Sequence, residues 1–211
     1  MKIILIGAEG RMGKAIVSLS YASEITQIGS PNSSLPNNIT PFLESHDLVL
    51  DLSTNEALSK NLPKVLLARK PIVIGITGLT KENLDLIHLA AKTIPVFLSP
   101  NFSIGIALLK KLLRQLPEGS YEMTEIHHMQ KKDSPSGTAL DLANCLPSYP
   151  KITSIREGAV IGVHKIELLF EHEKIELSHE VFDRKAFAKG ALMAATFLSN
   201  KPAGLYTSIY D

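Results

Sequence analysis

Residues 2–13 read Lys-Ile-Ile-Leu-Ile-Gly-Ala-Glu-Gly-Arg-Met-Gly, an apolar run followed at once by the spacing G-x-x-G-x-x-G. The continuous apolar run predicts a strand buried on both faces, and residues 14–21 after the glycines read as a helix. Between a strand and a helix, small residues let the chain turn sharply, approach a pyrophosphate and pack closely. This stretch therefore predicts a dinucleotide-binding loop, with a merely structural turn as the alternative.

The segments that follow alternate between strands and helices. Strands are expected at residues 25–29, 47–52, 72–76 and 95–98, and helices at 55–69 and 81–92. This alternation predicts an α/β fold, a Rossmann-like doubly wound parallel sheet whose ligands lie beyond the carboxyl ends of the strands. The segments that fall at those ends are Gly7–Gly13, Ser53–Thr54, Gly75–Gly78 and Ser99–Phe102.

The loop after the second strand leaves the choice of nucleotide open. In NAD-binding folds an acidic residue near this position holds the adenosine ribose hydroxyls. None is present between Gly29 and Phe42, so nothing in this loop would repel the 2′-phosphate of NADPH. The loop also contains no lysine or arginine, so the sequence is compatible with either NADH or NADPH.

The pattern changes after Asn101 and predicts a second, smaller α+β domain. A helix is expected at 104–116, and strand-like runs at 121–126, 152–156, 163–170 and 174–181 form an open mixed or antiparallel sheet. A helix at 184–199 is expected to return to the first domain. We therefore predict a dinucleotide-binding domain at 1–102, completed by 191–211, and a second domain at 103–190. One face of the open sheet needs a cover, and another subunit is expected to supply it.

Residues 127–138 carry the groups best suited to chemistry, since two imidazoles and two ammonium groups lie beside a Ser-Gly-Thr turn. The turn stands between a predicted strand and a predicted helix, where backbone N–H groups point at an incoming ligand. Histidine exchanges protons near neutral pH, and lysine supplies a mobile cation. The stretch predicts a site for a small anion such as a carboxylate, and a solvated basic loop is the alternative.

Composition narrows the functional classes. The chain has 211 residues, 45% hydrophobic and 20% charged, with a net charge of +1, which argues against nucleic acid and anionic membranes as partners. Its single cysteine, Cys145, fits a reducing compartment. No apolar run has the length of a signal-peptide core or a membrane span, so a soluble cytoplasmic protein is expected. The histidine spacing does not match a metal site, and no metal is expected.

The order of the motifs resembles the 4-hydroxy-tetrahydrodipicolinate reductase (dihydrodipicolinate reductase) family over nearly the whole chain. The motifs are the glycine loop, Gly75–Gly78, Pro100–Ser103, Glu125–Leu140, Arg156–Gly158 and Gly162–His164. The resemblance implies NADH- or NADPH-dependent reduction of a cyclic, imine-conjugated dicarboxylate in the diaminopimelate and lysine pathway, by a homotetramer built through the second domain's sheets.

The resemblance also assigns residues. His127 matches the acid/base histidine and Lys131 the proton-donating lysine. The residues matching the substrate site are His128, Ser136, Gly137 and Thr138. The residues matching the cofactor site are Gly7, Ala8, Glu9, Gly10, Arg11, Met12, Gly75, Ile76, Thr77, Ser99, Pro100, Asn101 and Phe102. Hydride addition to a conjugated imine leaves an enamine-like carbanion, and an acid such as Lys131 or His127 meets the need to protonate it.

The chain departs from the family pattern in places. Met193 stands where the family commonly has arginine, and the stretch between Leu146 and Arg156 is short. The alternatives are another Rossmann-fold NAD(P)-dependent oxidoreductase and a non-catalytic nucleotide or redox sensor. The short-chain dehydrogenases' Tyr-x-x-x-Lys pair is absent, which counts against them. A sensor has no reason to keep His127, Lys131 and the Ser-Gly-Thr turn together.

Overall fold

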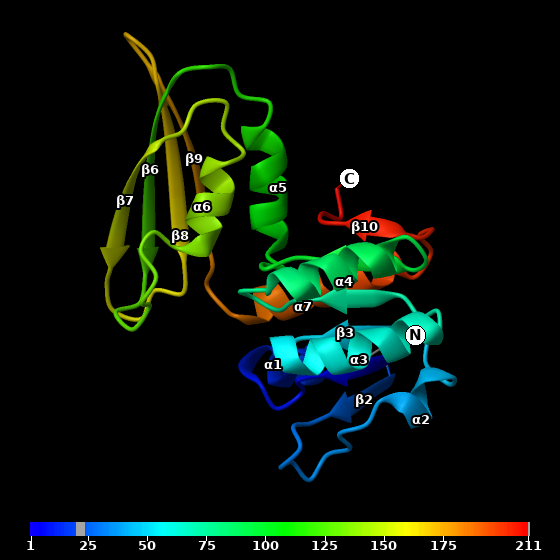
Figure 1. Ribbon diagram of the computed structural model, residues 1–211. Coiled ribbons are helices and arrows are strands. Elements are labelled where there is room, and N and C mark those ends of the chain that lie inside the picture. The colour runs from blue at the N-terminus through cyan, green and yellow to red at the C-terminus, as the bar shows by residue number, and fades with distance from the viewer. Residues whose placement is uncertain (20–23, 211) are drawn as a thin grey trace. The chain divides into compact units, whose positions relative to one another are not determined.

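A computed structural model describes residues 1–19 and 24–210, which form two compact units, each with its own sheet and its own buried apolar core (Figure 1). One unit contains Met1–Phe102 together with Lys185–Ile209, and the other contains Ser103–Arg184. The chain returns to the first unit at Lys185, whereas the sequence analysis placed this return at residue 191. The whole of the last helix therefore belongs to the first unit.

The first unit is built on a six-stranded sheet in the order β10-β5-β4-β3-β1-β2, with every pair of neighbours parallel. The strands are β1 (Lys2–Ile6), β2 (Glu24–Ile28), β3 (Leu48–Asp51), β4 (Ile72–Ile74), β5 (Pro95–Leu98) and β10 (Gly204–Tyr206). This sheet confirms the predicted doubly wound fold, although β10 was not predicted. The order reverses at β1, and such switch points are where open α/β sheets bind ligands.

Helices cover both faces of this sheet. They are α1 (Arg11–Leu19), α2 (Thr40–Leu43), α3 (Asn55–Leu67), α4 (Lys81–Ala91) and α7 (Lys185–Leu198). Ile4 and Ile6 belong to one buried cluster with residues of α3 and α4, while Ile3 and Leu5 belong to another with residues of α1 and α7. This alternation explains why β1 is apolar at successive positions. Residues 20 and 21 of the helix predicted at 14–21 lie outside the described residues.

Helix α7 packs closely because all of its buried residues except Leu198 are small, namely Ala188, Gly190, Ala191, Ala194 and Ala195. A Cβ at Gly190 would overlap the carbonyl oxygen of Phe102. Phe102 is itself buried and stacks on Phe97, with ring centroids 6.2 Å apart. Helix α7 therefore packs directly against Phe102, at the end of the segment that follows β5.

The second unit is a four-stranded sheet in the order β7-β6-β8-β9, with β6–β7 parallel and the other two pairs antiparallel. Its elements are α5 (Ile104–Leu113), β6 (Ser120–His127), α6 (Gly137–Ala143), β7 (Lys151–Arg156), β8 (Val163–Leu169) and β9 (Lys174–Glu180). Tyr121, Met123, Ile166 and Leu168 on one face pack with residues of α5 and α6. The sheet is therefore mixed, as predicted, and its other face carries no helix of this unit among the described residues.

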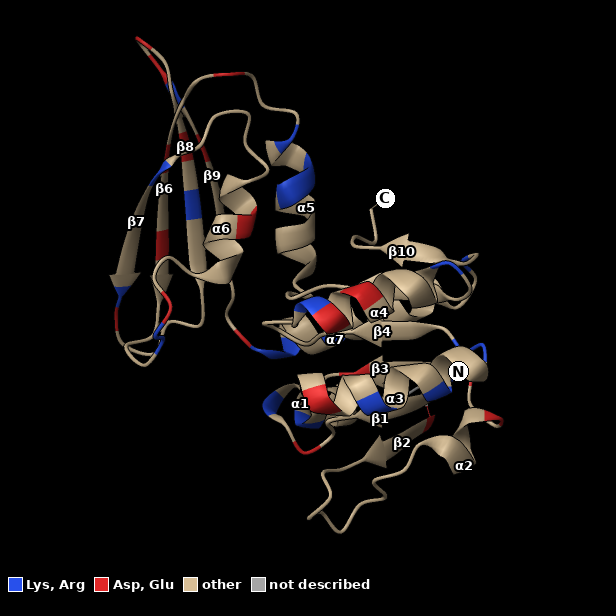
Figure 2. Ribbon diagram, viewed as in Figure 1, with Lys and Arg blue, Asp and Glu red and all other residues tan. Residues whose placement is uncertain are grey.

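None of the helices in the described part of the chain has the length and apolar character needed to cross a membrane. Charges of both signs are interspersed along α3 and α4 (Figure 2). This mixture agrees with the net charge of +1.

Candidate active site

The strand β6 carries two polar side chains on its buried face, Glu125 and His127. Alternate residues of a strand point to the same side, so both face the helices rather than the open side of the sheet. The Glu125 side chain is fully buried, and its Oε2 atom is hydrogen-bonded to Nδ1 of His127. An ionised carboxylate only accepts hydrogen bonds, so we assign the Nδ1 proton to His127 and leave its Nε2 as the free nitrogen.

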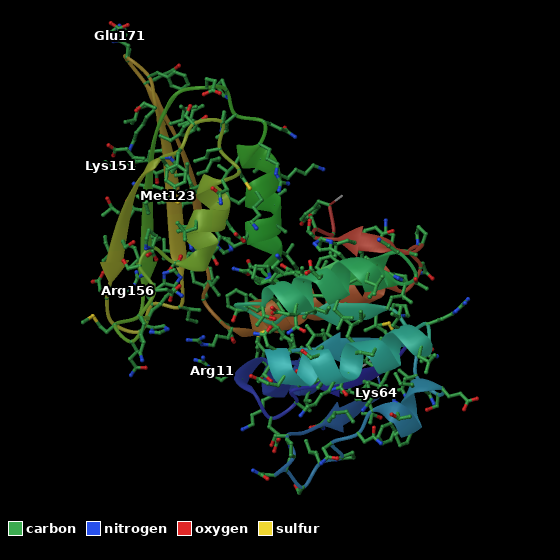
Figure 3. The ribbon with its side chains drawn as sticks, in the orientation of Figure 1. Arg11, Lys64, Met123, Lys151, Arg156 and Glu171 are labelled. Carbon is green, nitrogen blue, oxygen red and sulfur yellow. The ribbon has the colours of Figure 1, made fainter. Side chains whose placement is uncertain are left out.

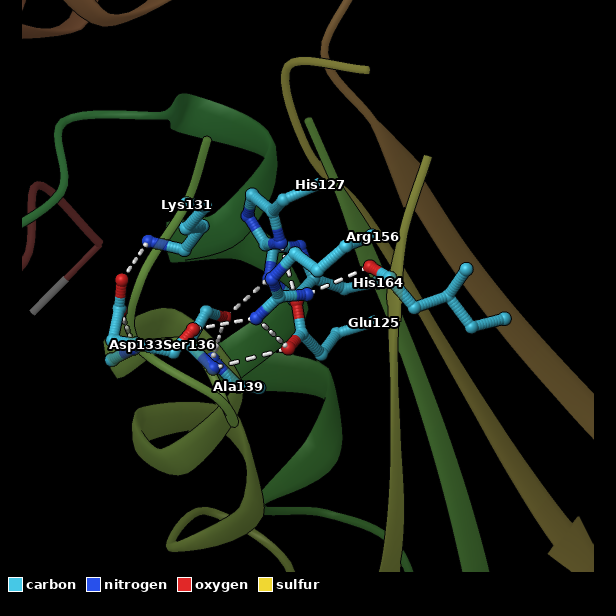
Figure 4. Close-up of polar contacts among 10 residues, drawn as sticks. Glu125, His127, Lys131, Asp133, Ser136, Ala139, Arg156 and His164 are labelled. Atoms are coloured by element: carbon cyan, nitrogen blue, oxygen red, sulfur yellow. Dashed lines mark hydrogen bonds and ion pairs between the residues drawn. The ribbon is translucent and has the colours of Figure 1, made fainter. Parts of the chain in front are cut away.

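The other oxygen of Glu125 joins two further segments to the end of β6 (Figure 4). Oε1 accepts a hydrogen bond from Nη2 of Arg156 at 2.7 Å and from the backbone N–H of Ser136 at 3.2 Å. The same Nη2 donates to the carbonyl oxygen of Asp133 at 2.6 Å. One carboxylate therefore fixes the end of β6, the end of β7 and the start of α6 relative to one another.

These contacts shift the pKa values of both partners. Burial opposes ionisation of Glu125, but hydrogen bonds from Arg156, Ser154 and His127 outweigh it and keep the Glu125 pKa below its usual range. Burial also lowers the pKa of His127, and the attraction of Glu125 offsets this only in part. The pair therefore rests as an ionised carboxylate beside a neutral imidazole at neutral pH.

Lys131 lies in the loop between β6 and α6, where its ammonium group pairs with Oδ1 of Asp133 at 2.9 Å. The side chain of Lys131 is 23% exposed, so the cation is within reach of a ligand. The other oxygen of Asp133, Oδ2, accepts a hydrogen bond from the backbone N–H of Gly137 at 3.3 Å. Asp133 thereby ties the lysine to the first turn of α6.

Ser136 begins α6, since its Oγ accepts a hydrogen bond from the backbone N–H of Ala139 at 3.1 Å. Gly137, the next residue, faces open space, because a Cβ there would meet nothing within 4 Å. Nδ1 of His128 is buried and has no partner among the described residues. Each substrate residue predicted from the sequence thus lies in the loop that carries Lys131 or at the start of α6.

A second buried histidine, His164, lies beside this loop, and no catalytic role was predicted for it from the sequence. His164 is buried, its ring centroid is 5.3 Å from that of His127, and its Nε2 is 3.5 Å from Oγ of Ser136. Burial lowers the His164 pKa to about 3, so it is a neutral partner of Ser136. Among residues 1–19 and 24–210, no cluster of three His, Cys, Asp or Glu side chains is arranged to hold a metal ion.

The glycine loop of the first unit follows β1. Gly7 has a φ of +83°, which side-chain-bearing residues rarely adopt, and the Gly10 N–H donates to its carbonyl at 3.1 Å. A Cβ at Gly13 would overlap the backbone of Gly7 and Ala8. The strand, turn and helix therefore approach as closely as a pyrophosphate-binding loop requires, and the side chain of Arg11 extends outward at the start of α1 (Figure 3).

Glu9 in this loop reaches the segment after β2. Its Oε2 accepts a hydrogen bond from the backbone N–H of Ser30 at 3.1 Å, and its Oε1 accepts one from Oγ of Ser33 at 2.7 Å. The segment after β2 has no carboxylate of its own between Gly29 and Leu43. The structure supplies one there from the neighbouring loop.

The ends of β4 and β5 carry the remaining cofactor candidates. Ile76 is buried and Thr77 is exposed, so Ile76 can offer only its backbone to a ligand. Oγ of Ser99 donates to the carbonyl oxygen of Asn101 at 2.6 Å and shapes that turn. Phe102 is packed into the core, where a Cβ at Gly75 would approach its ring to 2.5 Å. All these segments follow parallel strands of one sheet, so they share its carboxyl edge.

Two models of one protein family match the chain. The model described as dihydrodipicolinate reductase, N-terminus, matches residues 1–102, and the one described as dihydrodipicolinate reductase, C-terminus, matches residues 103–209. The chain belongs to the dihydrodipicolinate reductase family. This membership confirms the resemblance inferred from the motifs, and with it the class of enzyme, an NAD(P)H-dependent oxidoreductase.

Individual relatives agree with this assignment. The 4-hydroxy-tetrahydrodipicolinate reductase of Zymomonas mobilis is 37% identical over 98% of this chain and 94% of its own length. That of Thermosipho africanus is 37% identical over 98% and 95%. A dipicolinate-bound dihydrodipicolinate reductase from Paenisporosarcina has the same fold, with a TM-score of 0.78 and 22% identity over 99% of this chain and 98% of its own.

Proposed function

We propose that this chain reduces 4-hydroxy-tetrahydrodipicolinate to tetrahydrodipicolinate, with the 4-hydroxyl group leaving as water. This is the pyridine-nucleotide-dependent step of diaminopimelate and lysine biosynthesis. The proposal rests on one observation above others: a buried Glu125–His127 pair beside the partly exposed ammonium of Lys131, in a chain of this family. The names of the relatives from Zymomonas mobilis and Thermosipho africanus support the same substrate.

The first unit fits a dinucleotide. Its glycine loop brings backbone N–H groups to the carboxyl edge of the sheet, and a side chain at Gly7 or Gly13 would overlap the backbone that forms this close turn. Bound there, NADH or NADPH would supply the hydride. Residues Gly7–Met12, Gly75–Thr77 and Ser99–Phe102 would hold and orient it, with Ile76 contributing through its backbone and Phe102 by supporting the loop from the core.

The second unit would donate the proton that the reaction requires. After hydride addition, the carbanion must be protonated, and a cationic lysine is a competent donor for this step. Lys131 is the residue for that role, because its ammonium is held by Asp133 yet partly exposed. Neutral His127, with Nδ1 directed to Glu125, would serve as the acid/base group that passes protons through Nε2.

A cyclic dicarboxylate needs cations and N–H donors for its two carboxylates. Lys131 supplies a cation, and the open space at Gly137 leaves room for a carboxylate beside the start of α6. His128, Ser136 and Thr138 lie in the same loop or on the first turn of α6. The related Paenisporosarcina enzyme is described as dipicolinate-bound, which supports a ligand of this shape.

We further propose a homotetramer assembled through the open face of the second unit's sheet. On this face Ile126 pairs with Ile155 on one side and Val163 on the other, forming an apolar row across three strands. Ile155 is 38% exposed in a single chain. Burying such a row against other copies would remove apolar surface from water. A cytoplasmic location fits the biosynthetic reaction and the single free thiol of Cys145.

A coupled assay tests the reaction. The purified protein is mixed with the freshly made condensation product of pyruvate and aspartate semialdehyde, and loss of the reduced nicotinamide absorbance is followed with each nucleotide. Oxidation that depends on the condensation product is the expected result. If both nucleotides bind but neither is consumed, the catalytic proposal fails and a sensor role gains support.

A further inference from the structure

The segment after β2 lacks the acidic residue that usually recognises the adenosine ribose of NAD. Such a residue accepts hydrogen bonds from the ribose hydroxyls and disfavours a 2′-phosphate. Residues 29–43 contain no aspartate or glutamate and no lysine or arginine. From the sequence of this segment alone, the adenosine ribose would meet no charge.

The carboxylate of Glu9 occupies the region that this segment leaves open. It accepts hydrogen bonds from the Ser30 N–H at 3.1 Å and the Ser33 hydroxyl at 2.7 Å, so it is anchored where the segment leaves β2. Gly29 makes the approach possible, because a Cβ there would lie 3.0 Å from Oε2 of Glu9 and would overlap the Ser33 side chain.

Glu9 keeps the capacity to bind a ligand. Its side chain is exposed, and two carboxylate oxygens offer about four acceptor sites, of which the two serines use only part. The hydrogen bond from Ser33, then that from Ser30, lowers the Glu9 pKa, so the group is ionised at neutral pH. Lys14 is the cation whose charge acts on it, and no ion pair of Glu9 is formed among the described residues.

We propose that Glu9 is the residue that sets nucleotide preference, and that it makes this enzyme select NADH over NADPH. Its anchored carboxylate accepts hydrogen bonds from the 2′- and 3′-hydroxyls of the adenosine ribose and repels a 2′-phosphate. The inference rests on the proposed function only in taking a nicotinamide dinucleotide as the ligand of the first unit.

Binding measurements test this without turnover. The affinities of the full-length protein for NADH and NADPH are measured by titration calorimetry, for the wild type, Glu9→Gln and Ser33→Ala. The wild type should bind NADH roughly tenfold or more tightly than NADPH, because like charges in contact disfavour the phosphorylated ribose. Glu9→Gln keeps the shape and removes the charge, so it should bring the two affinities close together, whereas Ser33→Ala should keep most of the preference.

Adenosine 5′-monophosphate and adenosine 2′,5′-bisphosphate, measured on the same variants, report on the ribose end alone. A wild type that binds NADPH as tightly as NADH overturns the proposal. So does a Glu9→Gln variant that weakens both nucleotides in parallel, since that result identifies Glu9 as a loop support. Thermal melting verifies the folding of each variant, and Glu9→Asp, which keeps the charge on a shorter side chain, should retain a preference for NADH. Either failure leaves the catalytic proposal standing if the coupled assay succeeds.

Discussion

At the scale of single residues, Glu125 is the residue whose substitution should change the site most. Its fully buried carboxylate accepts hydrogen bonds from His127, Arg156 and the N–H of Ser136. Glu125→Gln leaves the guanidinium of Arg156 without its anion and should lower the free energy of unfolding by up to about 3–5 kcal/mol, the range for breaking a buried pair. Urea denaturation measures this change. Glu171→Gln, at the exposed tip of the β8–β9 hairpin (Figure 3), is the matched control and should leave stability unchanged.

The same substitution makes a prediction about pH. The neutral form of His127 is the active one in our proposal, so turnover should fall as His127 becomes protonated, below its ordinary pKa of 6.5. Glu125 raises the His127 pKa, and removing its charge should move this acid limb to lower pH while reducing the maximal rate. A pH–rate profile of wild type and Glu125→Gln measures both effects. An acid limb that stays in place would separate Glu125 from the proton chemistry.

Lys131 and its neighbour Lys132 offer a paired test of the proton donor. Lys131→Ala should reduce kcat roughly a hundred- to ten-thousand-fold, the range for losing a general acid. Its dinucleotide affinity should be unchanged, because the dinucleotide loop lies in the other unit. Lys132→Ala removes an exposed charge from the same loop and should have a small effect. Equal losses in the two variants would identify a general effect of loop charge instead of a donor.

At the scale of elements, the small residues of α7 determine how closely this helix packs. Gly190→Ala should destabilise the protein by roughly 1–3 kcal/mol, as overpacking does, because the new methyl group meets the backbone carbonyl of Phe102, which cannot rotate away. Gly137→Ala, at the start of α6 where space is open, is the matched stability control and should not destabilise. Thermal melting compares them, and equal melting temperatures would contradict the packing argument.

At the scale of the whole molecule, the apolar row Ile155–Ile126–Val163 on the open sheet face predicts assembly. Ile155→Asp should convert a tetramer to smaller species, since a charge in the buried interface would lose its hydration. Sedimentation velocity measures the outcome. Leu67→Asp, on the 88% exposed side chain of α3, is the control and should leave the mass unchanged. A wild type that sediments as a monomer would refute assembly through this face.

The sequence by itself determined the fold class, the family and most of the candidate site. The fold class and the family could be predicted because their signals are local. Buried parallel strands are apolar at successive positions, and the glycine loop between a strand and a helix has a fixed spacing, so both signals come from residues close together in the chain. The candidate chemistry of the β6–α6 junction was visible for the same reason, because His127, Lys131 and Ser136 all fall within residues 127–136.

Only the tertiary structure decided which distant residues meet. Glu125 and Arg156 are 31 positions apart, and Glu9 and Ser30 are 21 apart, so no periodicity within a single element relates either pair. The return of the chain at Lys185 and the added strand β10 likewise depend on packing against elements far away in sequence. Such contacts depend on how helices and strands pack against one another. The helix or strand propensity of a short segment carries no information about that packing.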